Sequence, residues 1–96
     1  MEKENLIINL YRKIISSLTC IEKRTNNAAI KNKATSYLNQ YIDYYEKYLN
    51  KKEFQILNIS DLIDFCNECY DDADVFDYAE DVEYCAKEFI KETYNK

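Results

Sequence analysis

Residues 4–21 read ENLIINLYRKIISSLTCI and carry the clearest structural signal in the chain. The aliphatic side chains recur every three or four residues, at Ile7, Leu10, Ile14, Leu18 and Ile21. This spacing places them on one face of an α-helix, whereas the charged Arg12 and Lys13 fall elsewhere. We therefore predict an amphipathic helix over residues 3–23, with one side packed against a hydrophobic core.

The apolar periodicity stops at Asn26-Asn27 and then resumes, which predicts a second helix that ends near Asn50. Asparagine suits the end of a helix because it can take the left-handed conformation at a C-cap. The predicted core stripe of the second helix consists of Ala34, Leu38, Tyr41, Ile42, Tyr45 and Leu49. Residues 51–59 stay open, since their apolar side chains fit either a helical extension or a loop that crosses the bundle.

Two further helices are predicted in the second half of the chain. Ser60 is a good N-cap, and Asp61 follows in the first turn, where the helix dipole favours a carboxylate. The third helix should end at residues 71–72, and the fourth should begin near Asp74 or Asp77. The side chains predicted to face the core are Leu62, Phe65, Cys66 and Cys69 on the third helix, and Val75, Tyr78 or Ala79, Val82, Ala86, Phe89 and Ile90 on the fourth.

The composition favours helices, because the 96 residues include no glycine and no proline. Hairpins and most tight turns depend on these two residues, whereas helices joined by short Asn, Asp and Lys loops need neither. A chain of this length has room for one hydrophobic core. We predict an all-α fold, a small antiparallel four-helix bundle, with residues 1–96 forming a single helical domain.

The sequence predicts a cytoplasmic protein that does not contact a membrane. No run approaches the roughly 18 consecutive apolar residues of a membrane span, and the N-terminus lacks the basic region of a signal peptide. Thiols stay reduced in the cytoplasm. The four cysteines, Cys20, Cys66, Cys69 and Cys85, are therefore interpreted as small apolar side chains of the core.

No metal, cofactor or catalytic residue is predicted. Cys66 and Cys69 have zinc-ligand spacing, but a closed zinc site needs four Cys or His ligands and the chain has no histidine. Asp72, Asp74 and Glu83 fit three positions of a calcium loop that lacks the glycine of its sharp turn. Without a histidine base, a phosphate-binding glycine loop or a distinctive carboxylate pair, a binding protein is favoured over an enzyme.

Charge divides the chain into a basic and an acidic half. Residues 1–52 hold ten Lys/Arg and five Asp/Glu, whereas residues 53–96 hold three Lys and thirteen Asp/Glu. The densest acidic run has no basic residue in it and consists of Asp71, Asp72, Asp74, Asp77, Glu80, Asp81 and Glu83. Helix N-termini and solubility explain some of these carboxylates, but like charges this close repel one another. Their concentration indicates a surface for a positively charged partner.

Five of the ten tyrosines lie on the predicted second helix: Tyr37, Tyr41, Tyr44, Tyr45 and Tyr48. They cannot all face the core, and Tyr41 and Tyr45 follow the apolar stripe. Tyr44 and Tyr48, like Tyr37, are therefore expected to be partly exposed. Such rings either anchor a partner or flank the core with their hydroxyls in water. Direct binding of nucleic acid would need a basic groove, which the negative net charge disfavours.

The order of features over residues 60–92 resembles the C-terminal half of the colicin D-type immunity proteins, small helical bundles that neutralise a tRNA-cleaving toxin. The resemblance is carried by Cys69-Tyr70-Asp71-Asp72-Ala73-Asp74, then Tyr78, then Glu80-Asp81-Val82 at the start of the last amphipathic helix. It implies that Asp71, Asp72, Asp74, Asp77, Glu80 and Asp81 occupy the basic, RNA-binding face of a toxin.

We therefore expect a bacterial immunity or inhibitor protein that binds a basic toxin, of the nuclease type, through an acidic surface. One alternative is a phage- or plasmid-encoded inhibitor of the anti-CRISPR kind that mimics nucleic acid. Another is a structural helical protein that self-associates through the tyrosines of its second helix. In the first two cases the partner is a basic protein, and the chain itself is a monomer or weak homodimer.

Overall fold

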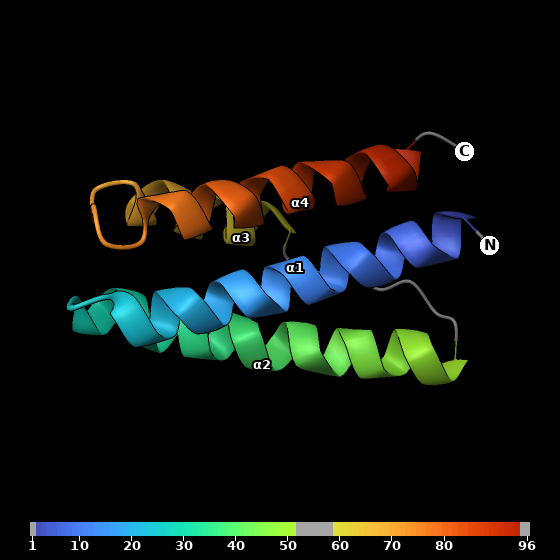
Figure 1. Ribbon diagram of the computed structural model, residues 1–96, viewed down its shortest axis with the longest axis horizontal. Helices are drawn as coiled ribbons and strands as arrows, with labels where there is room; N and C mark the ends of the chain where they lie inside the picture. Colours follow the sequence, from blue (N-terminus) through green and yellow to red (C-terminus); the bar gives the residue numbers. More distant parts are fainter. Residues whose placement is uncertain (1, 52–58, 95–96) are drawn as a thin grey trace.

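The computed structural model describes residues 2–51 and 59–94, and all the regular elements in these ranges are helices. They are α1 (Glu2–Arg24), α2 (Ala28–Lys51), α3 (Ile59–Cys69) and α4 (Phe76–Tyr94). Helix α1 packs on α2 and α4, and α3 packs on α4 and α2. The α1–α2 loop and the α3–α4 turn lie at the same end of the molecule (Figure 1). The predicted all-α antiparallel four-helix bundle is confirmed.

Helix boundaries follow the local signals closely. Helix α1 extends one residue beyond the predicted range at each end. Asn27 caps α2, because its Oδ1 accepts the backbone N–H groups of Ala29 at 2.9 Å and Ile30 at 3.2 Å. Helix α4 begins at Phe76, between the two predicted starts. Whether residues 52–58 are helix or loop lies outside the described part of the chain.

The third helix is shorter than predicted. It begins at Ile59, one residue before Ser60, and ends at Cys69, two residues before the predicted end. With 11 residues it is about half as long as α1 and α2.

None of the four described helices is long and apolar enough to cross a membrane.

The core confirms the predicted faces of α1, α3 and α4. All five aliphatic residues predicted for α1 are buried, as are Leu62, Phe65, Cys66 and Cys69 on α3. On α4, Ala79 rather than Tyr78 is fully buried, while Tyr78 and Ile90 are half-buried. Cys85 is also buried and Cys20 is half-buried. The interpretation of the cysteines as core side chains therefore holds for three of the four.

The predicted core face of α2 is confirmed at Ala34 and Tyr41, half-buried at Leu38 and Tyr45, and wrong at Ile42 and Leu49. Tyr44 and Tyr48, expected to be partly exposed, are only 8% and 6% exposed, whereas Ile42 and Leu49, expected in the core, are 36% and 42% exposed. Tyr41 is buried as predicted and meets Tyr44 edge-on, with 5.3 Å between ring centroids. The larger aromatic surface of the tyrosines sets the buried face in preference to the two aliphatic side chains.

Aromatic rings from α1, α2 and α4 pack against one another inside the bundle. Tyr11 on α1 is fully buried there, and its ring centroid lies 5.0 Å from Phe89 on α4, 5.9 Å from Tyr45 and 5.8 Å from Tyr48 on α2. Tyr48 is buried because its ring packs into this aromatic cluster.

Candidate functional site

The two layers of the bundle carry opposite charge. The Lys/Arg surplus lies on α1 and α2, and the carboxylate surplus lies on α3, the following turn and α4. Ion pairs join the layers at their edges, from Lys13 to Asp81 at 3.5 Å and from Lys33 to Glu68 at 2.8 Å. These side chains are about half exposed, so the pairs contribute little to stability. The candidate site is the outer surface of the α3–α4 layer.

Two of the seven carboxylates in the predicted acidic run hold loops together. Asp72 accepts a hydrogen bond from the Thr25 hydroxyl at 2.6 Å and from the backbone N–H of Asp74 at 3.0 Å. The Asn26 amide donates to Asp74 at 3.4 Å. Since Thr25 is buried and also accepts the backbone N–H of Asn27, these bonds connect the α1–α2 loop to the α3–α4 turn.

The Thr25→Val variant should lower the free energy of unfolding by about 1–3 kcal/mol, because it keeps the shape of the side chain but removes the charge-assisted bond to Asp72. Urea denaturation followed by circular dichroism measures the loss. Thr25→Ser, which keeps the hydroxyl, is the matched control and should stay closer to the wild type. Equal stability of Thr25→Val and the wild type would show that the loops are held by other contacts.

Two more carboxylates of the run are paired, Glu83 within the α3–α4 layer and Asp81 with the α1–α2 layer. Glu83 accepts the Tyr70 hydroxyl at 2.7 Å and lies 2.7 Å from the Lys87 ammonium. These partners, Lys87 first, hold the pKa of Glu83 below its usual range. Asp81 pairs with Lys13 of α1. Four of the seven predicted residues therefore have partners within the protein, and the run is less available than its sequence suggests.

The remaining three carboxylates, Asp71, Asp77 and Glu80, are exposed and have no hydrogen-bond or ion-pair partner among residues 2–51 and 59–94. Helix α3 adds exposed carboxylates that the sequence interpretation missed: Asp61, Asp64 and Glu68. Their spacing of three and four residues was the available signal, since it places them together on one helix face. We define these six residues as the acidic surface.

Two aromatic side chains stand among these carboxylates, and sequence reasoning missed both. Phe76 is 40% exposed and Tyr84 is 64% exposed. They lie eight residues apart on α4 with Glu80 midway, so the three share one helix face. The Phe76 ring also contacts Tyr70, at 5.0 Å between centroids. This face, not the one around Tyr44 and Tyr48, exposes aromatic rings to solvent.

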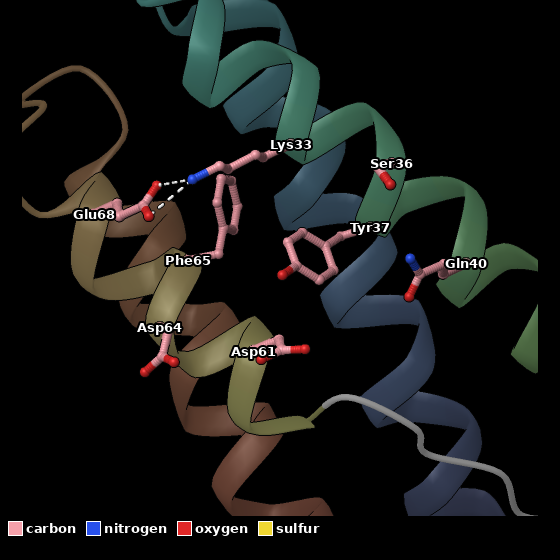
Figure 2. A pocket seen from close by; sticks show the side chains of 8 residues that line it. All are labelled: Lys33, Ser36, Tyr37, Gln40, Asp61, Asp64, Phe65 and Glu68. Carbon is pink, nitrogen blue, oxygen red and sulfur yellow. Dashed lines mark hydrogen bonds and ion pairs between the residues drawn. The ribbon is translucent and has the colours of Figure 1, made fainter.

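A groove between α2 and α3 continues the acidic surface around the side of the bundle (Figure 2). It has a volume of about 290 Å³ and includes Asp61, Asp64 and Glu68. A wider hollow of about 500 Å³ lies between the two loops and shares Glu68, with Asp71 and Asp72 in its wall. The groove and the hollow meet at Glu68, which lines both.

The buried thiols are held in their protonated form. Burial raises the pKa of Cys66 and Cys69 to about 12 and that of Cys85 to about 11. A thiol of this kind is a poor nucleophile and metal ligand at neutral pH. Among the described residues, no three Cys, Asp or Glu side chains are grouped so that they could hold a metal ion.

Comparison with protein-family models, curated proteins and solved structures finds no match to this chain. The resemblance of residues 60–92 to colicin D-type immunity proteins therefore stays a prediction. Function has to be inferred from the surface chemistry of the bundle itself.

Proposed function

We propose that this protein is an inhibitor of the immunity type, which binds a basic protein such as a nuclease toxin through the outer face of α3 and α4. The observation that carries the proposal is the set of exposed carboxylates without an internal partner, Asp71, Asp77 and Glu80, beside the exposed rings of Phe76 and Tyr84. Asp77 lies in the first turn of α4, where the helix dipole favours a carboxylate, but Asp71 and Glu80 neither start a helix nor pair with a lysine among the described residues.

The combination of aromatic rings and carboxylates is typical of a protein interface. Affinity at interfaces comes mainly from a few anchors, among which tyrosine is common, and charges around them direct association and set specificity. The α3–α4 layer carries both kinds of group on one face. A purely nucleic-acid-like mimic would need charge alone, so the aromatic rings favour a partner that also offers apolar contact.

Self-association through the tyrosines of α2 loses its basis, because Tyr44 and Tyr48 are buried in the core. An inhibitor that mimics nucleic acid would use the same acidic surface as an immunity protein, but it would bind a different basic partner. The product of the neighbouring gene distinguishes the two, since an immunity gene accompanies the gene of its toxin. Co-purification with that product, and rescue of cells that express it, tests the proposal directly. A neighbour that is neither bound nor toxic would contradict it.

Charge reversal should be made at Asp77 and Glu80, not at Asp72, where the hydrogen bonds to Thr25 and Asp74 would also be lost. The Asp77→Lys/Glu80→Lys variant should associate with the basic partner at least about tenfold more slowly at low ionic strength. The difference should shrink as salt is raised. Stopped-flow or surface-plasmon measurements of the association rate check this.

The matched control is Asp43→Lys/Glu46→Lys, which makes the same change in net charge on the exposed side of α2. It should associate much more like the wild type, since its charges lie on the opposite layer. Both variants should keep the wild-type helicity, because exposed charges contribute only about 0–1 kcal/mol. Equal rates for the two variants would place the interface elsewhere.

A further inference from the structure

The groove between α2 and α3 has the chemistry of a specific binding site. Figure 2 shows Lys33 at one end, Gln40 toward the other and Tyr37 between them. Helix α3 contributes the opposite wall. The lining consists of Lys33, Ser36, Tyr37, Gln40, Asp61, Asp64, Phe65 and Glu68. The groove exists because α3 and α2 have the least extensive contact of the packed helix pairs.

Aromatic surface lies at the centre of the groove. The ring centroids of Tyr37 and Phe65 are 5.2 Å apart and their planes are tilted by 37°. Phe65 is buried, whereas Tyr37 is half-buried and keeps part of its ring at the groove. A flat group that enters the groove can therefore stack on an aromatic face.

The polar groups of the groove are short of hydrogen-bond donors. Lys33 donates to both carboxylate oxygens of Glu68, at 2.9 and 2.8 Å, so its charge is already neutralised. Asp61 and Asp64 are exposed and have no partner among the described residues. The side-chain oxygen of Gln40 is buried and accepts no hydrogen bond within the same part of the chain. A buried acceptor without a donor is costly, by about 1–3 kcal/mol.

Electrostatics favour a cation in this position. One lysine faces three carboxylates, which leaves the groove with a negative charge. Burial first, and then Asp61, raise the pKa of the Tyr37 hydroxyl, so that this group stays neutral and can accept a hydrogen bond. A cation with several N–H donors would satisfy the groups that the bundle leaves unpaired.

The size of the groove suits one long side chain. Its volume of about 290 Å³ lies at the lower end of the range of about 300–1,000 Å³ that is usual for small-molecule sites. The Lys33–Glu68 pair joins α2 and α3 at one end of the groove (Figure 2). A single long side chain, supplied from outside, fits this volume.

We infer that the groove between α2 and α3 binds an arginine side chain of the basic partner. Arginine suits it better than lysine because the guanidinium group is flat, stacks on aromatic rings and presents five N–H donors. It would lie against Tyr37 and donate to Asp61 and Asp64. The inference rests on the proposed function, since the partner supplies the arginine, and it adds a specific contact to the wider acidic surface.

The test uses the isolated protein and two small probes, N-acetyl-arginine N-methylamide and the corresponding lysine derivative. Each is titrated at constant ionic strength while ¹H–¹⁵N chemical shifts are recorded. The arginine probe should give saturable shifts at Ser36, Tyr37, Gln40 and Phe65, with a dissociation constant on the order of 10 mM. The lysine probe should bind about two- to fivefold more weakly, the difference expected for exposed cation–π stacking.

Variants separate the groove from the rest of the acidic surface. Asp61→Asn/Asp64→Asn should weaken binding of the arginine probe at least about threefold, whereas the matched variant Asp77→Asn/Glu80→Asn should leave it unchanged. Tyr37→Leu should abolish the preference for arginine over lysine. Circular dichroism verifies that each variant keeps its helices. If Tyr37→Leu does not fold, Tyr37→Phe is measured in its place; it retains the ring, so it should retain the preference for arginine over lysine.

Shifts that never saturate, equal affinity for the two probes, or equal losses in the two double variants would overturn the inference. None of these results depends on the identity of the partner. Failure of the groove would therefore leave the charge-reversal test of the proposed function intact. Conversely, a neighbour that does not bind would remove the proposed function while the groove could still be shown to hold a guanidinium group.

Discussion

Replacing Phe89 by alanine should lower the free energy of unfolding by about 3–5 kcal/mol. Phe89 is 0% exposed, and its ring lies 5.0 Å from that of Tyr11, between centroids. The variant loses the transfer free energy of the ring and leaves a cavity beside Tyr11. Urea denaturation measures the change. For a domain with about 5–15 kcal/mol in total, such a loss leaves little stability.

Leu38→Ala is the matched control for this prediction. The sequence suggests that Leu38 and Phe89 belong equally to the core, but Leu38 is only half-buried and packs against the edge of the core. Its truncation should therefore cost no more than about 2 kcal/mol. If the two variants were equally stable, Phe89 would not fill the space beside Tyr11 as tightly as its burial indicates.

The difference between these two residues shows how far the sequence determines the fold. Periodicity predicted α1 because its isoleucine and leucine side chains recur every three or four residues on one helix face. The same rule failed on α2, where Ile42 and Leu49 were ranked above Tyr44 and Tyr48. Which side chains fill a bundle depends on what the other helices place opposite them, and here Tyr48 packs against Tyr11 of α1.

The acidic surface was predicted in part for a similar reason. The position of Asp77 and Glu80 on the outside of α4 follows from helical spacing alone. The role of Asp72 does not, because its partner Thr25 lies 47 residues away and only the meeting of two loops brings them together. The groove likewise joins residues of α2 and α3 that no local pattern connects. Long-range contacts of this kind decide which carboxylates are available to a partner.

The second large effect is expected at alkaline pH, where the protein should lose stability steeply. Burial raises the pKa of Cys66 and Cys69 to about 12 and that of Cys85 to about 11, above the ordinary thiol value of 9.0. Above pH 9 these thiols ionise in the unfolded chain but stay protonated in the folded one. The unfolded state therefore binds fewer protons, and stability falls as pH rises toward the folded pKa values.

Each of the three thiols should contribute a loss of about 1 kcal/mol per pH unit in this window. The combined loss between pH 9 and pH 10.5 should be roughly 5 kcal/mol, comparable with the whole stability of a small domain. Burial also raises the pKa of Tyr41, which acts in the same direction at higher pH. Urea denaturation under reducing conditions, repeated at several pH values from 8 to 10.5, gives the slope.

The thiols can be separated from a general weakening of the core by two variants. Replacing Cys66, Cys69 and Cys85 together by alanine should lower stability at pH 8, through the cavities left behind, but flatten its dependence on pH. Val82→Ala removes buried methyl groups and keeps every thiol, so it should be less stable at pH 8 while retaining the wild-type slope. A wild-type slope in the triple variant would mean that groups other than the thiols release the protons on unfolding, and a flat wild-type profile to pH 10.5 would mean that the thiols ionise without unfolding.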